Sequence, residues 1–162
     1  VYGALGVDSN TDIETVSLNS VEIQGPSCSI DQKNLNIRFG SVPLDKFKGA
    51  GSVSDNKDFQ LSFTCNQTTN IHITLQASQN NDTSDNSIIA LTNVGSPGVS
   101  DGLGLQILYD NNPLKIGENT SLTNISGSTS KTLNFQTRYY QVKSRVTPGE
   151  ANATATLNFI YQ

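Results

Sequence analysis

The chain has few side chains that could perform catalytic or metal chemistry. His72 is its single histidine, and Cys28 and Cys65 are its two cysteines. His72 falls on the polar phase of an alternating run and has no serine or cysteine nucleophile motif near it, so a surface position explains it better than a general base. Two cysteines and one histidine this far apart cannot supply a tetrahedral zinc site. We therefore expect no enzyme activity, no metal and no cofactor.

Two further motifs superficially look like ligand sites. Gly102 and Gly104 resemble part of a phosphate loop, but the third glycine is missing and the residues after them have the pattern of a strand rather than a helix. Asp82, Asp85 and Asn86 could offer oxygens to calcium, yet they lack the EF-hand spacing and its bidentate glutamate. The first motif is interpreted as the start of a strand and the second as a solvated loop.

A cluster of basic and aromatic residues near the C-terminal end is a candidate sugar-contacting patch. It consists of Arg138, Tyr139, Tyr140 and Arg145. Exposed positions on a strand are the simpler interpretation of the same residues.

Composition excludes two broad classes of protein. The chain has 162 residues, a net charge of −4 and a pI near 4.8. Its ten Lys and Arg residues are scattered, whereas phosphate neutralisation needs clustered basic side chains, so we expect no nucleic-acid partner. No apolar run approaches the ~18–20 residues of a membrane span. The length fits one domain of ordinary size.

The two cysteines indicate an oxidising compartment. Cys28 and Cys65 each lie beside a strand-like run, and no C-x-x-C redox motif is present. A disulfide fits such an acidic chain rich in Asn, Ser and Thr better than a redox pair does, and it would contribute roughly 4 kcal/mol on the chain-entropy model. Two buried thiols are the alternative.

Alternation of apolar and polar residues dominates the pattern, which predicts half-buried strands. Polar and glycine- or proline-containing turns separate these runs, and a single helical turn is expected near residues 43–47. Short strands at this spacing, together with the cysteine pair, predict an immunoglobulin-like β-sandwich. The alternating runs are 35–39, 59–65, 71–77, 103–109, 133–139 and 153–161, and the turns are 80–86, 95–98, 110–113 and 147–149.

The first 27 residues have a different pattern. Their alternation slips in phase, because Val16 and Leu18 follow one register and Val21 and Ile23 the other. A strand buried on one face should not slip unless it bulges or changes partner. We therefore expect a segment that can form a strand but is only weakly associated with the core of the domain that follows.

The last apolar run, residues 152–162, reaches Gln162 itself. Two interpretations stay open from the residues alone. The run is either an ordinary internal strand whose carboxylate reaches solvent, or a strand whose sheet is completed from elsewhere.

Residues 28–162 resemble subunits of the chaperone–usher pilus family, the relatives of type 1 and P pili. Four groups of residues carry the resemblance in the same order along the chain. The family's C-terminal signature is a penultimate aromatic residue, matched by Tyr161, and a glycine fourteenth from the end, matched by Gly149. The four groups are Pro26 to Ile30 with Leu35, Ile37, Phe39, Gly40 and Val42; Phe47, Gly49 and Gly51 with Phe59, Leu61, Phe63 and Cys65; Gly102 to Ile107 with Pro113 and Leu114; and Phe135, Thr137, Arg138 and Tyr139 with Asn152 to Thr156, Tyr161 and Gln162.

The resemblance implies an all-β, immunoglobulin-like sandwich that lacks its last strand and is completed by a donor strand. Residues 28–162 would be the pilin domain and residues 1–27 an N-terminal extension. The implied partners are a periplasmic pilus chaperone, an outer-membrane usher and neighbouring subunits, with a final location in an extracellular fimbrium. The groove and its C-terminal strand would be formed by Gly149, Ala153, Ala155, Leu157, Phe159, Tyr161 and Gln162.

The extension is longer than the family's usual one and lacks a glycine at the family's fixed position, which leaves the identity of the donor segment open. Val16, Leu18 and Ser20, continued by Val21 and Ile23, form the favoured segment. The competing segment consists of Val1, Gly3, Leu5 and Val7.

We expect a structural subunit, with a minor or adaptor pilin favoured. The alternative is the pilin domain of a tip adhesin, with residues 15–25 ending an upstream receptor-binding domain and a host glycan as partner.

Overall fold

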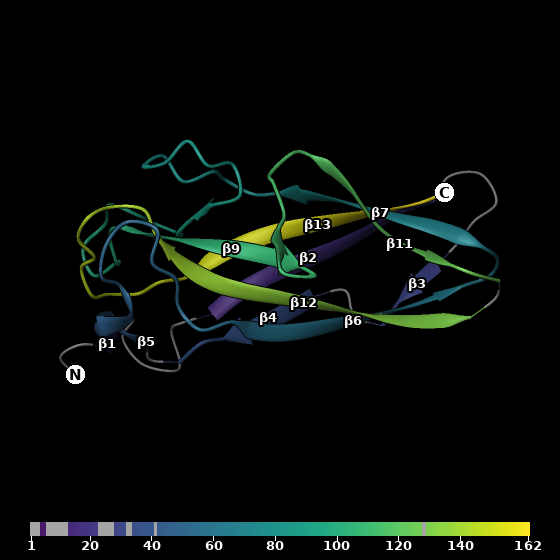
Figure 1. The fold of residues 1–162 in the computed structure, drawn as a ribbon, viewed down its shortest axis with the longest axis horizontal. Coiled ribbons are helices and arrows are strands. Elements are labelled where there is room, and N and C mark those ends of the chain that lie inside the picture. Colours follow the sequence, from purple (N-terminus) through teal and green to yellow (C-terminus); the bar gives the residue numbers. More distant parts are fainter. Residues whose placement is uncertain (1–3, 6–12, 23–27, 32–33, 41, 128) are drawn as a thin grey trace.

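The computed structural model of the chain describes residues 4–5, 13–22, 28–31, 34–40, 42–127 and 129–162. Strands form nearly all of its regular structure and lie in two sheets packed face to face (Figure 1). The sequence-based prediction of an all-β sandwich is therefore confirmed.

The first sheet is antiparallel and has the order β10-β9-β12-β6-β3, with β8 also paired to β9. Its long strands coincide with alternating runs of the sequence, and its β9–β10 hairpin turns at Asp110 and Asn111, both with positive φ. The bounds are β3 Cys28–Ile30, β6 Lys57–Cys65, β8 Ile89–Ala90, β9 Leu103–Tyr109, β10 Asn112–Pro113 and β12 Ser130–Gln141.

The second sheet has the order β11-β7-β13-β2-β4. Three of its four pairings are antiparallel, and β2 runs parallel to β13. The bounds are β2 Ile13–Glu22, β4 Asn34–Arg38, β7 Thr69–Gln76, β11 Asn119–Ile125 and β13 Ala153–Tyr161. The strand between β13 and β4 thus comes from the N-terminal extension, ahead of the domain it joins.

A small third pairing lies outside the two main sheets, where β1 (Ala4–Leu5) meets β5 (Val42–Pro43). The short 3₁₀ helix η1 (Leu44–Lys46) follows, at the place where a helical turn was predicted. No helix in the described part of the chain is long and apolar enough to cross a membrane.

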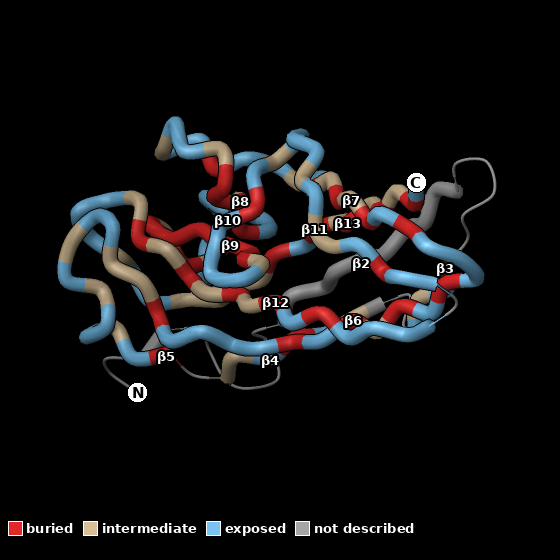
Figure 2. The backbone as a smooth tube through the Cα atoms, turned by 45° about the vertical axis from the view of Figure 1, so that its right-hand side comes forward, coloured by how far each residue is buried: buried red, intermediate tan, exposed pale blue. Residues whose placement is uncertain are grey.

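The core lies between the two sheets and is built from the inward-facing phase of each strand. In β6 and β13 buried and more exposed residues alternate along most of the strand, as the sequence pattern predicts. Aromatic rings join the sheets, since Phe63 of β6 lies edge-on to Phe159 of β13 with ring centroids 5.0 Å apart. Figure 2 shows the buried positions concentrated along the facing surfaces of the strands.

Two observations differ from the sequence-based expectations. The edge strand β11 was not predicted, because its register against β7 shifts between Ser121 and Thr123 and breaks the period-2 pattern. The phase slip in β2 causes no bulge against β13, since that ladder runs from Glu14 to Glu22 without a shift. The pairing with β4 instead ends at Ser17, so β2 loses one of its two neighbours just before the slip.

Candidate functional site

The inward face of β13 forms the floor of the candidate site. Its alternate side chains are 5% exposed or less, and three of them are completely buried. Residues of the neighbouring strand β7 that are equally buried extend this apolar surface. The buried residues of β13 are Ala153, Ala155, Leu157, Phe159 and Tyr161, and those of β7 are Ile71, Ile73 and Leu75.

The C-terminal end of this strand is fixed by main-chain hydrogen bonds. The Gln162 N–H donates to the carbonyl oxygen of Asn70 at 2.9 Å, and the Asn70 N–H donates to the main-chain oxygen of Gln162 at 2.6 Å. These two bonds continue the β13–β7 ladder, which joins Thr156–Tyr161 to residues 71–76. All the C-terminal residues named from the sequence are therefore in one place, and Gly149 lies ahead of them.

β2 occupies the other side of β13. In its register Val16 stands opposite Ala155, Leu18 opposite Leu157 and Ser20 opposite Phe159, which are the buried positions of β13. Val21 stands opposite Ile160, a half-buried position of the opposite phase. Ile23 lies outside the described residues.

Only Leu5 of the competing donor segment lies among the described residues. Leu5 belongs to β1 and pairs with Val42 of β5, not with β13. Val1, Gly3 and Val7 are outside the described residues. Among the described residues, the structure thus brings Val16 to Val21 to the edge of the terminal strand and places Leu5 on β5.

Gly149 has a steric reason to be glycine. A Cβ at this position would lie 2.6 Å from the Ser100 nitrogen and 2.7 Å from the Gly98 oxygen, closer than real Cβ contacts. The chain is held there by neighbouring bonds, because the Glu150 N–H donates to the carbonyl oxygen of Gly98 and the Ser100 N–H donates to that of Glu150, each at 2.8 Å. The glycine therefore lets the chain pass close to residues 98–100 just before β13 begins.

The predicted disulfide is present. Cys28 and Cys65 stand directly opposite each other in the β3–β6 pairing, and their sulfurs are bonded. Because Cys28 follows the extension directly, the disulfide anchors the point where the extension joins the sandwich.

The other residues singled out from the sequence do not gather into a second site. His72 lies half-buried on the outer face of β7, where its Nδ1 is 3.1 Å from Oδ1 of Asn119. Tyr139 points into the core, and its hydroxyl donates to the carbonyl oxygen of Ala151. The grouping of Tyr139 with Arg138 and Tyr140 as one exposed patch is therefore wrong, because adjacent residues of a strand face opposite sides.

Gly102 and Gly104 serve packing at β9. Gly104 lies within the strand, and a Cβ there would lie 2.2 Å from Cγ2 of Ile88 and 2.9 Å from the carbonyl oxygen of Ile89. The start of β8, which pairs with β9, thus lies closely against this strand. Among the described residues no group of three His, Cys, Asp or Glu could hold a metal ion.

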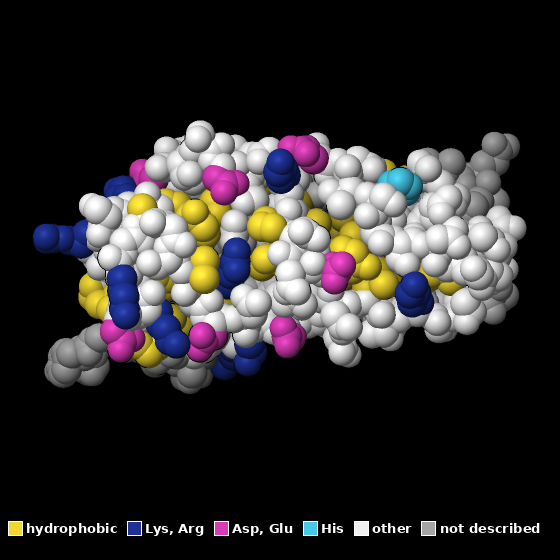
Figure 3. All heavy atoms as spheres, in the orientation of Figure 1, with side chains coloured by type: hydrophobic (Ala, Val, Ile, Leu, Met, Phe, Trp, Pro, Cys, Tyr) yellow, Lys and Arg dark blue, Asp and Glu magenta, His cyan; other side chains and the backbone are white. Residues whose placement is uncertain are grey.

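Charged side chains are scattered among neutral ones on the face shown in Figure 3. A bond from Lys143 to Asp101 raises the pKa of the lysine, with Asp82 also contributing. Partial burial, with a smaller contribution from Asp110, raises the pKa of Tyr109.

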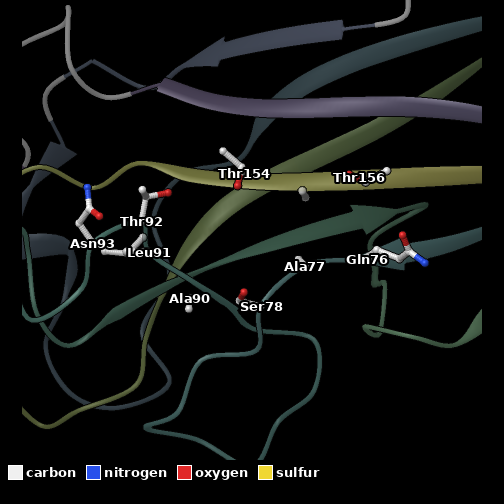
Figure 4. A pocket seen from close by; sticks show the side chains of 10 residues that line it. Gln76, Ala77, Ser78, Ala90, Leu91, Thr92, Asn93, Thr154 and Thr156 are labelled. Carbon is white, nitrogen blue, oxygen red and sulfur yellow. The ribbon is translucent and has the colours of Figure 1, made fainter.

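A polar cavity of about 630 Å³ lies on the β7 side of the start of β13 (Figure 4). Hydroxyl and amide side chains line it together with Ala77, Ala90, Leu91 and Ala155, and none of the described lining residues is charged. It opens where β7 ends, since the β7 pairing stops at Thr156. The polar lining residues are Gln76, Ser78, Thr92, Asn93, Thr154 and Thr156.

Sequence reasoning missed a buried polar network beside β9. Gln106 is 2% exposed, donates from Nε2 to Oγ of Ser87 at 2.9 Å and accepts from Nε of Arg138 at 2.9 Å. Asn80, taken from the sequence as part of a polar loop, is 3% exposed and donates to the carbonyl oxygen of Leu103. Asn80 lies in a loop and Gln106 on the polar phase of β9, and residues of either kind give no signal in the sequence that they are buried.

Known proteins share this sequence pattern and fold. A family profile described as "Fimbrial protein" matches residues 18–162. A type-1 fimbrial protein subunit of Serratia marcescens is 30% identical over 152 residues, which cover 87% of this chain and 83% of that protein. A fimbria adhesin protein of Klebsiella pneumoniae is 23% identical over 156 residues, which cover 91% of this chain and 49% of that protein. The chain thus spans about half of the length of that adhesin.

Among solved structures, the P pilus rod subunit PapA is similar, with a TM-score of 0.65 and 20% identity. The likeness covers 83% of this chain and 99% of PapA. At this identity it establishes the fold.

Proposed function

The chain belongs to the fimbrial protein family, a family of structural subunits rather than enzymes, and from this we propose that it assembles into a bacterial chaperone–usher pilus by donor-strand exchange. Residues 28–162 are the pilin domain, and residues 1–27 are the extension that a neighbouring subunit receives. The observation that carries the proposal is the position of β2, which fills the place between β13 and β4 although it precedes the domain in sequence.

Residues 28–162 alone provide β13 with a neighbouring strand on one side only. Without β2, the side of β13 away from β7 would have no strand, and the row of buried side chains on β13 would lie at a sheet edge. A strand that covers about five such side chains contributes on the order of 10 kcal/mol before ordering costs are subtracted. Any extended segment of suitable pattern gains from occupying this groove.

The direction of β2 in its own groove is dictated by a short link. Glu22 and Cys28 are joined by residues 23–27, which span at most about 20 Å when extended. β3 lies at the same end of the molecule as the C-terminus (Figure 1), so Glu22 must finish beside Tyr161, where it pairs. An antiparallel β2 would finish beside Ala153, about 27 Å away along the strand, which the link cannot reach.

A groove on another subunit removes that restriction. The extension of one molecule can then enter the groove of the next antiparallel to β13, and antiparallel pairing is slightly more stable per residue than parallel pairing. The same segment therefore has a better partner in a second copy than in its own domain, which favours a chain of subunits over closed single molecules.

The proposed partners follow from this role. A periplasmic chaperone strand would cover the same face of β13 until a neighbouring extension replaces it, the usher would pass the subunits outward, and the finished location is an extracellular fimbrium.

A second candidate function is the pilin domain of a tip adhesin that binds carbohydrate. The match to half of the Klebsiella pneumoniae adhesin favours it. Binding of this chain to immobilised glycans would place the receptor site on the domain itself.

The test uses the full chain and a synthetic peptide of residues 13–23 that carries a fluorophore at its N-terminus. Fluorescence anisotropy should report slow, saturable incorporation into the groove, and a peptide with Leu18→Asp should not incorporate. A spin label at the peptide N-terminus should broaden NMR signals near Tyr161 and not those near Ala153, because insertion is antiparallel. Absence of incorporation into the folded chain would refute donor-strand exchange.

A further inference from the structure

The extension contacts the domain at a second place besides β2. β1 pairs antiparallel with β5, with Leu5 opposite Val42 and Ala4 opposite Pro43. Val42 is 8% exposed and belongs to the hydrophobic core. The extension is thus attached at both ends of its path, by β1 on β5 and by β2 on β13.

This second contact depends on the parallel direction of β2. Ile13 begins β2 and pairs with Arg38, the last residue of β4, and β5 begins at Val42 shortly afterwards. Ile13 therefore lies at the end of β4 that leads to β5, the strand with which Leu5 pairs.

An antiparallel insertion into a second molecule separates the same groups. Ile13 would then lie near the acceptor's Tyr161, about 27 Å from the end of the groove where β5 lies. The stretch from Leu5 to Ile13 spans at most about 28 Å, and it would have to run back beside a strand that is already in place. The β1–β5 pairing therefore forms readily in the closed molecule, whereas in the exchanged one it would need the whole link to be fully extended.

We propose that β1 is a latch that holds the extension in its own groove and slows its release to another subunit. The inference rests on the proposed donor-strand role, because it concerns how fast the groove becomes available. Release of β2 requires the β1–β5 pairing to open first or to be lost together with it. A pairing of this length is comparable to one or two net hydrogen bonds, which corresponds to about a tenfold change in rate.

The experiment compares three folded chains in the same peptide-incorporation assay: the full chain, a chain without residues 1–10 and a control chain without residues 1–2. The second lacks β1, whereas the control retains it, and both retain β2 and the disulfide. We expect about tenfold faster incorporation into the chain without residues 1–10, and no change in the control. A second variant, Leu5→Pro in the full chain, removes a main-chain N–H from the pairing and should also accelerate incorporation.

Equal rates in the full chain and the chain without residues 1–10 would overturn the latch and leave donor-strand exchange standing. Slower incorporation into the shortened chain would overturn it as well. If no chain incorporates the peptide, the proposed function fails together with the latch, so the two failures are distinguishable.

Discussion

The two sheets of the sandwich bury their core residues equally well, but their strands come from different parts of the chain. The sheet that contains β12 draws every strand from residues 28–162, and its first strand is joined to β6 by the disulfide. The sheet that contains β13 has a strand from the extension between two strands of the domain. Burial alone does not distinguish them, since Phe135 of β12 and Phe159 of β13 are both fully buried. The difference lies in connectivity, because one sheet consists only of strands from residues 28–162, whereas the other includes a strand from the N-terminal extension.

The largest expected effect is a loss of stability from a matched pair of substitutions, one in each sheet. Phe135→Ala and Phe159→Ala each remove a ring that packs against another aromatic ring, Phe59 in the first case and Phe63 in the second. Each should lower the free energy of unfolding by about 3–5 kcal/mol, measured by chemical denaturation.

Incorporation of the labelled 13–23 peptide should respond to the same two substitutions differently. Phe159 stands opposite Ser20 in the β2 register, so Phe159→Ala should weaken peptide binding, whereas Phe135→Ala should leave it unchanged wherever the variant is folded. Equal weakening by both substitutions would contradict the assignment of the groove to β13.

The next effect concerns the disulfide between β3 and β6, at the point where the extension joins the sandwich. Replacing both Cys28 and Cys65 by Ala should lower the free energy of unfolding by roughly 2–4 kcal/mol, because the unfolded chain regains the freedom that the closed loop removes. Denaturation of the oxidised chain with and without reductant is the measurement. An unchanged midpoint on reduction would show that the disulfide contributes nothing to the sandwich.

The long strands were predictable because each places one face in the core. Leu157 and Phe159 alternate with polar neighbours in the sequence and are completely buried in the structure. β11 was not predictable, because its register shift puts Leu122 and Ile125 out of period-2 spacing. Alternation thus reveals strands with a regular ladder and conceals edge strands with an irregular one.

The position of β2 could not follow from its own residues. Val16 and Leu18 indicate a strand, but its neighbour and direction depend on the reach of residues 23–27 and on where Cys28 lies in three dimensions. Gly149 shows the same limit, since its spacing from Tyr161 marked it in the sequence while its steric role required the backbone of residues 98–100.

A smaller effect tests that steric role. Gly149→Ala should lower the free energy of unfolding by about 1–3 kcal/mol, because the new Cβ would overlap main-chain atoms of Gly98 and Ser100. Gly49→Ala is the control, since a Cβ at Gly49 meets no described atom within 4 Å and φ there is not in the positive range. Equal thermal midpoints for the two variants would remove the argument that Gly149 sets the path into β13.

The smallest expected effect tests whether only the inward phase of β13 matters. Thr156 lies between the buried Ala155 and Leu157 on the opposite face of the strand, half-exposed beside the polar cavity. Thr156→Val keeps the shape and the β-branch, so the free energy of unfolding should change by no more than about 0.5 kcal/mol. Leu157→Ala, one residue along, should lower it by about 2–5 kcal/mol. A loss at Thr156 as large as that at Leu157 would mean that the outer face of this sheet is packed against something in solution, and the sheet would then depend on two partners instead of one.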